Sequence, residues 1–454
     1  MTTFADLERL VADRLLRPDA TGFAEATFAQ FARTGDPPAA VVRVRSTTEV
    51  AAAVRAARSA GLPVAVRSGG HSYALHSAGP GALVIDVRAL DSVAIDADRL
   101  VGRAGGGVTA GAYSRAAGKH GLATGFGDIG TVGVGGVALG GGIGFLSRRD
   151  GLTVDNIQSA EIVLADGSVL TVDAREHPDL FWALRGGGGN FGVVTGLTFR
   201  LHRTAVVTGG MLAFAPSPAR LVAAVDAVLD APDGLSAMVN LLVAPPLPFL
   251  PPELHGRPVM LVLACWSGAP QDAEDALAPL RAIGQPLVEA LDTHSYPDLL
   301  RGPPTPPQPA YPVMRTGFTG RLDERFGEAA LRSLATAGMF AAFNLRPLGG
   351  AIGRTPPEAT AFAHRDRDVM VTVSALVQDS TAVPTAQDWV DEASRAVGLS
   401  GAGYVNFMSG ATPEDVAAAY PGVLDRLREV KAAYDPGNVF RFNHNVTPPG
   451  GPAG

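Results

Sequence analysis

The residues in this sequence best suited to chemistry are a histidine and the two glycines before it, in the hexapeptide RSGGHS at residues 67–72. Adjacent glycines allow positive φ angles or a close approach of the backbone to another group. His71 then has two interpretations. It is either a turn histidine that hydrogen-bonds to a nearby carbonyl, or a nucleophilic imidazole held close to an electrophile. The hexapeptide taken alone favours the first.

A second stretch, at residues 127–157, reads GDIGTVGVGGVALGGGIGFLSRRDGLTVDNI and has more glycine than an ordinary core needs. The backbone N–H groups of such a loop can surround phosphate or carbonyl oxygens. A flexible linker would be rich in glycine and serine, without the valine and leucine interleaved here. The composition therefore predicts a ligand-binding loop.

Two glycine patterns match dinucleotide-binding fingerprints. Residues 187–192 fit GxGxxG, and residues 105–110 fit its looser form. The fingerprint requires a strand before the turn and a helix after it. Around 187–192 the order is reversed, because HPDLFWALR (177–185) has a helical pattern and VVTGLTF (193–199) an extended one. The match at 105–110 has no acidic residue at the distance expected for ribose, so an NAD-binding protein is disfavoured.

The elements that must position these stretches alternate along the first 200 residues. The capping-box pattern STTE (46–49) predicts a helix that ends at Gly61, and a strand follows at 63–66 and leads into RSGGHS. The run 82–87 is apolar on both faces, which predicts a buried strand. Two more strands meet at a tight turn around residues 96–98, before a helix at 109–118.

The composition and the pattern of predicted elements change after residue 205. Glycine thins out, and the strands expected at 259–266 and 369–377 predict a second α/β layer with its own sheet. The proline-rich segment 302–312 cannot be a helix interior or a central strand, so we expect an exposed loop there. The last stretch, 423–446, is expected to be a helix followed by YDPGNVFRFNHNV.

The composition excludes several classes of protein. The net charge is −7, the only lysines are Lys119 and Lys431, and no basic stripe suited to nucleic acid is present. The single cysteine, Cys265, excludes an intrachain disulfide and a cysteine-rich metal cage, so no metal site is expected. The N-terminal residues lack the apolar core of a signal peptide, and no run reaches the roughly 18 apolar residues of a membrane span. We therefore expect a cytoplasmic protein without a membrane partner.

Five blocks in this order give the chain a family resemblance: RSGGHS, TVGVGGVALGGGIG, GLTVDN, DLFWALRGGGGNFGVVT and YDPGNVFRFNHN. Together they resemble the FAD-linked oxidases of the vanillyl-alcohol oxidase superfamily, in the berberine bridge enzyme-like branch, and are similar to the bacterial hydroxynicotine oxidases. The resemblance implies an α+β, two-domain FAD-binding fold with a second α/β substrate domain covering the flavin. The expected domains are 1–205 for FAD, 206–422 for substrate, and a C-terminal segment, 423–454, that returns to the FAD-binding domain.

The resemblance also implies which residues hold the cofactor. In the family, the histidine of SGGH is bonded to the 8α-methyl carbon of the flavin, so His71 is the expected attachment point. The other expected FAD contacts are Arg67, Ser68, Gly69, Gly70, Ser72, Gly130, Thr131, Val132, Gly135, Gly136, Gly141, Gly144, Val194, Asn443 and Asn445. Many relatives carry a cysteine that forms a second bond to the flavin. That position is Ile129 here, so a single covalent link is expected.

Catalytic residues follow from the same resemblance. A small residue at Val132 leaves room for O2 beside the flavin, which implies oxidase behaviour. GYVNFMSG (403–410) resembles a segment where relatives supply a tyrosine base, and period two would place Tyr404 and Asn406 on one strand face. Tyr404 is either that base, if its pKa falls from about 10, or a plain cross-strand aromatic residue. Relatives frequently have a carboxylate or amide near Val373.

The expected activity is therefore transfer of a hydride from a small organic substrate to covalently bound FAD, followed by reduction of O2 to H2O2. An amine, an alcohol, a sugar and a natural-product intermediate all stay open as substrates. The alternatives are a dehydrogenase with another acceptor, and a non-redox role in which the flavin scaffold binds a metabolite or shapes a cyclisation. The arginine-, alanine- and glycine-rich composition suggests bacterial secondary metabolism. The oligomeric state stays open.

Overall fold

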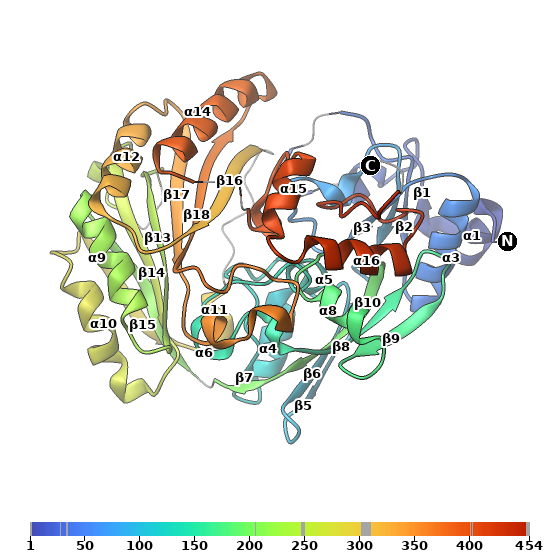
Figure 1. Ribbon diagram of the computed structural model, residues 1–454, viewed down its shortest axis with the longest axis horizontal. Coiled ribbons are helices and arrows are strands. Elements are labelled where there is room, and N and C mark those ends of the chain that lie inside the picture. Colours follow the sequence, from blue (N-terminus) through green and yellow to red (C-terminus); the bar gives the residue numbers. More distant parts are fainter. Residues whose placement is uncertain are drawn as a thin grey trace.

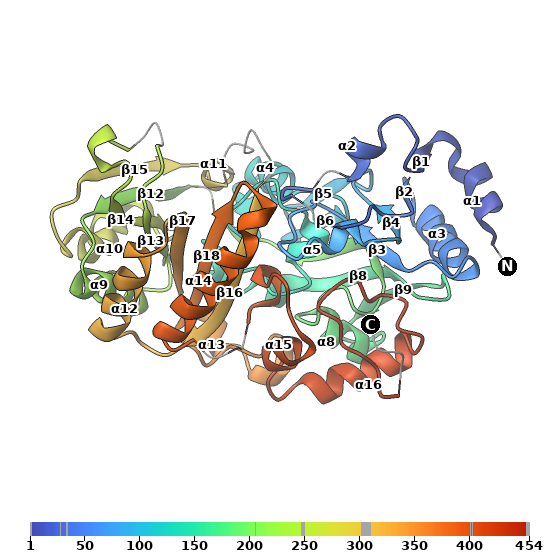
Figure 2. The ribbon, with the colours of Figure 1, turned by 90° about the horizontal axis from the view of Figure 1, so that it is seen from above.

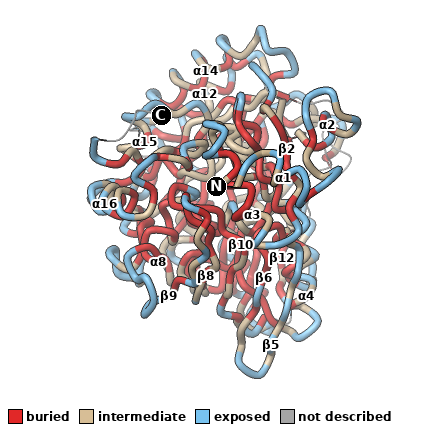
Figure 3. Tube along the Cα trace, turned by 90° about the vertical axis from the view of Figure 1, so that its right-hand side faces the viewer, coloured by how far each residue is buried: buried red, intermediate tan, exposed pale blue. Residues whose placement is uncertain are grey.

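The computed structural model describes residues 2–27, 29–32, 35–204, 206–246, 250–300, 310–399, 401 and 403–450. It has two lobes (Figure 1). The first contains a four-, a five- and a two-stranded sheet from residues 15–203, and the second contains a seven-stranded sheet from residues 207–377. Buried residues run through the interior, and exposed ones lie on the outer helices and turns (Figure 3). The predicted two-domain α+β architecture is confirmed, while the boundaries at 205 and 422 stay predictions.

The four-stranded sheet has the order β1–β2–β4–β3, in which β2, β4 and β3 are parallel. Its strands are β1 (Leu15–Leu16), β2 (Ala40–Arg43), β3 (Val64–Arg67) and β4 (Leu83–Asp86). All four residues of β4 are buried, as its apolar run predicted. Because β3 ends at Arg67, the hexapeptide 67–72 leaves from the carboxyl end of a parallel strand.

Helix α3 (Thr47–Ser59) connects β2 to β3 and begins where the sequence predicts. The side chain of Ser46 accepts a hydrogen bond from the amide of Glu49. The reciprocal half of the predicted capping box is not formed, because the Glu49 carboxylate pairs with Arg14 instead, at 2.6 Å. The other helices of this region are α1 (Phe4–Val11) and α2 (Phe23–Thr27).

The five-stranded sheet is antiparallel, in the order β5–β6–β10–β8–β9. Its strands are β5 (Val93–Asp96), β6 (Val101–Gly105), β8 (Ile157–Val163), β9 (Val169–Asp173) and β10 (Val193–Arg200), and β7 (Leu122–Ala123) pairs with β11 (His202–Arg203). The helices are α4 (Ala110–Gly118), α5 (Val134–Val137), α6 (Ser147–Asp150), α7 (Thr153–Asn156) and α8 (Pro178–Leu184). Residues 187–192 lie between α8 and β10, which is the reversed order expected from the sequence.

The seven-stranded sheet is antiparallel, in the order β15–β12–β14–β13–β17–β18–β16. Its strands are β12 (Val207–Phe214), β13 (Leu235–Val243), β14 (Pro258–Trp266), β15 (Val288–His294), β16 (Tyr311–Thr319), β17 (Phe340–Pro347) and β18 (Val369–Val377). One face packs on the helices α9 (Pro218–Leu229), α10 (Ala273–Arg281), α12 (Glu324–Ala335) and α14 (Val383–Ala396). These helices lie on the outer side of the second lobe (Figures 1 and 2), so the opposite face of the sheet is turned toward the first lobe.

Two predictions need correction here. Most of the loop expected at 302–312 lies outside the described residues, but its end is strand, because β16 begins at Tyr311 and contains Pro312. A proline is tolerated there because β16 is an edge strand. Tyr404 and Asn406 do not lie on a strand either, since residues Val405–Phe407 form a 3-10 turn.

The chain returns to the first lobe after the second sheet. Helices α15 (Pro413–Ala419) and α16 (Leu424–Tyr434) lie over that lobe, where α16 packs against α8 (Figure 1). The short helices α11 (Tyr296–Leu299) and α13 (Ala351–Arg354) lie between the two lobes. The 3-10 helices are Ala12–Arg14, His76–Ala78, Pro252–Leu254, Pro270–Asp272, Pro357–Ala359, Ser380–Ala382 and Val405–Phe407. Among the described residues, no helix is both long and apolar enough to cross a membrane.

Candidate active site

A cavity of about 430 Å³ lies between the two lobes. The first lobe contributes the turn after β3 and the two glycine-rich stretches around 127–137 and 187–194. The second lobe contributes side chains from β16, β17 and β18, and the C-terminal segment contributes residues 440–444. Stretches far apart in the sequence therefore meet at one pocket, which is the arrangement expected of an enzyme site.

The turn after β3 lines this pocket and has unpaired backbone amides. In the described part of the chain, the N–H groups of Gly69, Gly70, His71 and Ser72 donate no hydrogen bond. Gly70 has a φ of 71°, which favours glycine and curves the chain so that successive amides can converge. Converging amides of this kind form a site for anionic oxygens such as those of a pyrophosphate.

The same turn packs so closely against the glycine-rich stretch 127–137 that neither segment has room for a side chain at the contact. A Cβ on Gly69 would lie 2.2 Å from the Gly133 amide nitrogen, and a Cβ on Gly133 would lie 2.2 Å from Ser68 Oγ. A Cβ on Gly135 would lie 2.5 Å from the carbonyl oxygen of Gly106. The predicted ligand-binding loop thus packs backbone to backbone against the histidine turn, and both line the pocket.

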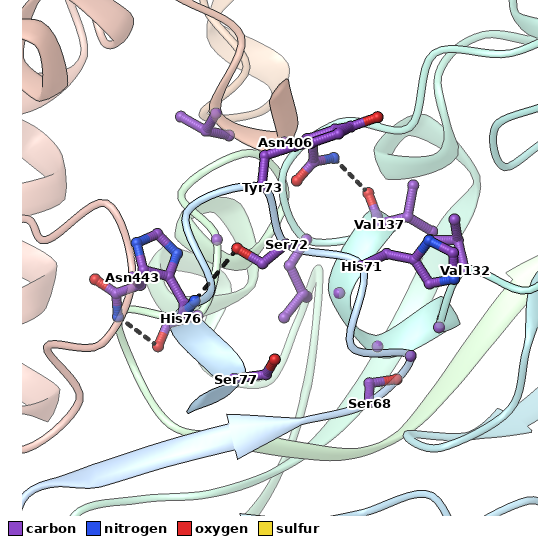
Figure 4. A pocket seen from close by; sticks show the side chains of 18 of the residues that line it. Ser68, His71, Ser72, Tyr73, His76, Ser77, Val132, Val137, Asn406 and Asn443 are labelled. Carbon is purple, nitrogen blue, oxygen red and sulfur yellow. Dashed lines mark hydrogen bonds between the residues drawn. The ribbon is translucent and has the colours of Figure 1, made fainter. Parts of the chain in front are cut away.

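His71 lines the pocket beside Val132 (Figure 4). Burial lowers the pKa of His71, while a hydrogen bond with the backbone of Thr131 acts in the opposite direction. The imidazole is therefore neutral at physiological pH and keeps one ring nitrogen with a free lone pair. This neutral form is compatible with both interpretations of His71, because the bond with the Thr131 backbone is the one expected of a turn histidine, while the position in the pocket is the one expected of a nucleophile.

The predicted cofactor contacts divide into two groups. Those that line the pocket are Ser68, Gly69, Gly70, His71, Ser72, Val132, Gly135, Gly136, Val194 and Asn443. Those that do not are Arg67, Gly130, Thr131, Gly141, Gly144 and Asn445. The Arg67 side chain instead donates to the carbonyl of Ala26. Gly130 donates its amide to Leu300 at 2.9 Å, which places it in the packing behind the pocket wall.

Several pocket residues were missed in the sequence. Glycines 187–189 and Asn190 line the cavity, although we set their pattern aside because it has no Rossmann order. His76 and His444 also line it, with ring centroids 4.7 Å apart in an edge-on contact. Burial lowers the pKa of His76 to about 3 and that of His444 to about 4, so both imidazoles are neutral. The glycine run was a usable signal, whereas neither histidine has a local one.

The side chains of Tyr404 and Asn406 contact each other, but a 3-10 turn brings them together and not a strand. The Tyr404 hydroxyl oxygen accepts from the Gly142 amide at 2.7 Å and from Asn406 Nδ2 at 2.9 Å. Asn406 Nδ2 also donates to the carbonyl of Val137 at 3.0 Å (Figure 4). Burial raises the pKa of Tyr404, and the two donors oppose that rise. No described residue accepts the hydroxyl proton, which leaves it available to a molecule in the pocket.

Strand β18, which the sequence predicts at 369–377, contributes two residues to the pocket. Val373 packs in the apolar core under the helices, while Thr372 and Ser374 line the pocket. His364 and Arg365 precede this strand and make contacts outside the pocket lining. His364 Nε2 hydrogen-bonds to the carbonyl of Ala419 at 3.0 Å, and Arg365 pairs with Asp155 at 2.6 Å. The described residues contain no group of three or more histidine, cysteine, aspartate or glutamate side chains arranged to hold a metal ion.

Two protein-family matches cover the chain segments that form much of this site. Residues 38–173 match the FAD binding domain family, and residues 403–447 match the berberine and berberine-like family. The (R)-6-hydroxynicotine oxidase of Paenarthrobacter nicotinovorans is 33% identical over 97% of this chain and 98% of that protein. An uncharacterised FAD-linked oxidoreductase of Bacillus subtilis is 30% identical over 90% of this chain and 92% of its own length.

Solved structures agree with these sequence matches. The crystal structure of 6-hydroxy-D-nicotine oxidase from Arthrobacter nicotinovorans has a TM-score of 0.85 at 30% identity, over 96% of this chain and 98% of that one. The xylooligosaccharide oxidase of Myceliophthora thermophila, in complex with xylobiose, has a TM-score of 0.84 at 24% identity, over 98% and 99%. The second match concerns the fold alone.

Proposed function

The chain belongs to the berberine bridge enzyme-like FAD-linked oxidoreductases of the vanillyl-alcohol oxidase superfamily, and from this membership we propose that it is an oxidase with FAD bound covalently through His71 alone. The substrate loses a hydride and a proton as it is oxidised, and O2 takes up both and becomes H2O2. The observation that carries the proposal is the row of unpaired amides at residues 69–72, which ends beside a neutral imidazole in the inter-lobe pocket.

The residues present fit FAD. The unpaired amides suit its pyrophosphate, and the side-chain-free contact of Gly69 with Gly133 fixes this turn against the glycine-rich stretch that also lines the pocket. Bound flavin would supply the two-electron chemistry, which no protein side chain provides. Ile129 lines the pocket where many relatives have a cysteine, and the sole cysteine, Cys265, is buried elsewhere. This supports a single covalent link.

The protein's own part in the reaction is to hold the substrate and accept its proton. Tyr404 is the proposed base, because the Gly142 amide and Asn406 Nδ2 both point at its oxygen and would stabilise a phenolate. Burial raises the pKa of Tyr404, so the base form grows as pH rises. Val132 lines the pocket beside His71, where a small side chain would leave space for O2.

The test is to add amines, alcohols and sugars to the purified protein, first without air and then with it. Loss of oxidised-flavin absorbance without air, followed by H2O2 formation with air, is expected. Bleaching without peroxide would show a dehydrogenase, and a flavin that dithionite reduces but no substrate bleaches would show a non-redox scaffold. Val132→Leu should slow reoxidation by O2, whereas the matched control Val137→Leu, elsewhere on the pocket wall, should slow it less.

The setting of the enzyme is also part of the proposal. The arginine-rich, lysine-poor composition supports an origin in bacterial secondary metabolism, and the acidic balance with a single cysteine supports a cytoplasmic location. Its expected partners are a small organic substrate and molecular oxygen. Fractionation of the source cell, followed by detection of the chain, tests the location.

A further inference from the structure

The pocket face of the second sheet carries a row of polar side chains across four adjacent strands. Backbone register places Asn240, Asn344, Thr372 and Thr316 opposite one another on β13, β17, β18 and β16. Because side chains alternate along a strand, neighbours such as Phe343 point into the core beneath the helices instead. The face turned toward the expected flavin side therefore carries this polar row.

Formal charge is nearly absent from this pocket. Of the described residues that line it, Asp128 and Arg346 are the only acidic or basic ones apart from the histidines. These two pair with each other at 3.2 Å and join the glycine-rich stretch of the first lobe to β17 of the second. The histidines that line the pocket all have pKa values lowered by burial, so they are neutral. The lining as a whole has no net charge.

Arg346 is held firmly in this pair. Its side chain is 6% exposed, its Nε donates to Asn344 Oδ1 at 3.0 Å, and its guanidinium lies 5.0 Å from the centroid of the Phe407 ring. A carboxylate of a substrate would compete with Asp128 for the guanidinium, and an ammonium would compete with Arg346 for the carboxylate. The first would place a second negative charge beside Asp128, whose side chain is 23% exposed, and the second would weaken the pairing of the buried Arg346. Both changes are unfavourable.

The polar row leaves one hydroxyl without a partner. Thr372 is 4% exposed, lines the pocket, and its Oγ1 makes no hydrogen bond with any described residue. Its neighbours are engaged: Thr316 Oγ1 accepts from the Tyr404 amide at 2.6 Å, and Asn344 Nδ2 donates to Asn240 Oδ1 at 2.7 Å. A buried hydroxyl without a partner is costly, so a ligand that hydrogen-bonds to Thr372 gains binding energy there.

We propose that the Asp128–Arg346 pair restricts this enzyme to uncharged substrates, and that Thr372 holds a hydroxyl group of such a substrate. The substrate class is a neutral hydroxylated molecule, such as a sugar or an alcohol, and neither a carboxylate nor an ammonium compound. This inference rests on the proposed oxidase function, since it concerns the substrate of that reaction. The pair acts as a specificity determinant, because it decides which charge of a substrate can be placed beside it.

The test compares probes that share a scaffold and differ in charge at one substituent. One set is glucose, glucosamine and glucuronate, and a second is benzyl alcohol, 4-(aminomethyl)benzyl alcohol and 4-(hydroxymethyl)benzoate. The rate constant for anaerobic flavin reduction should be at least about tenfold higher for the neutral member of a set, because each charged member must be buried without a counter-charge. A charged member that reduces the flavin faster than its neutral counterpart would overturn the inference.

Variants of the pair should invert this preference. Asp128→Asn leaves the Arg346 charge unpaired, so the anionic probe should gain at least about tenfold relative to the neutral one. Arg346→Gln leaves Asp128 unpaired, so the cationic probe should gain instead. If both variants keep the order of the unmodified enzyme, the pair is not the determinant.

Thr372 has its own variants, which leave the ion pair intact. Thr372→Val should lower the reduction rate constant with the neutral probe about tenfold, the worth of one hydrogen bond, and Thr372→Ser should restore most of it. Thr293→Val removes an exposed hydroxyl from the same sheet and is the matched control. An equal loss in the Thr372→Val and Thr293→Val variants would contradict the role of Thr372. A flavin that dithionite reduces but no probe of any charge reduces would instead contradict the oxidase function.

Discussion

Replacing Lys431 with methionine should destabilise the protein by about 3–5 kcal/mol, the cost of leaving a buried charge without its partner. Both Lys431 and Asp435 are fully buried, and Lys431 Nζ lies 2.7 Å from Asp435 Oδ2. The ammonium also donates to the carbonyls of Asn190 at 2.6 Å and Phe440 at 2.9 Å. Lys431 therefore joins the glycine run 187–190 to the C-terminal segment, and both stretches line the pocket.

Urea unfolding followed by tryptophan fluorescence measures this loss. Lys119→Met is the control, because Lys119 is the other lysine and is exposed, and it should change the free energy of unfolding by less than about 0.5 kcal/mol. The double variant Lys431→Met, Asp435→Asn should recover part of the loss, because no unpaired charge remains. A loss below about 1 kcal/mol in Lys431→Met, or no recovery in the double variant, would refute the reasoning.

Three further predictions concern other parts of the chain. Burial lowers the pKa of His364 to about 4, so the unfolded chain takes up a proton as pH falls below about 6.5 while the native state does not. The free energy of unfolding should therefore fall by about 2 kcal/mol between pH 7 and pH 5 on account of His364. This part of the fall should be missing in His364→Gln when unfolding is measured across the same pH range. Gly69→Ala should lower the flavin content of the purified protein, because the new Cβ would lie 2.2 Å from the Gly133 nitrogen. Gly320→Ala, whose Cβ would lie 3.7 Å from its nearest neighbour at an exposed position outside the pocket lining, should keep its flavin. Tyr404→Phe should slow substrate oxidation by about 10²–10⁴-fold if Tyr404 is the base, and a loss below tenfold in stopped-flow reduction would exclude that role.

Local patterns in the sequence predicted the elements that hold the site. The helix after Ser46 and the buried strand 83–86 followed from a capping residue and an apolar run, both of which act over a few residues. The glycine density at 127–157 predicted a ligand loop because side chains are excluded where backbone meets backbone, as at Gly133. The position of His71 just after a strand was also predicted from local sequence, whereas the parallel pairing of that strand was not.

Contacts between distant residues could not be predicted in this way. The hydrogen bond from Gly142 to Tyr404 joins residues 262 apart, and the Asp128–Arg346 pair joins residues 218 apart. The period of a strand would place Tyr404 and Asn406 on one face. Instead, the Phe407 amide donates a hydrogen bond to the Tyr404 carbonyl at 2.8 Å and closes a turn there. Thr372 and Ser374, not Val373, reach the pocket because strand register decides which face a residue takes.

Acid precipitation of the purified protein tests most directly whether the flavin is held by a single covalent bond to His71. We expect the yellow flavin to stay with the precipitated chain and to fluoresce on a denaturing gel, and to pass into the supernatant when His71 is replaced by alanine. Flavin that leaves the unmodified chain in acid, or stays with the His71→Ala chain, would contradict the account.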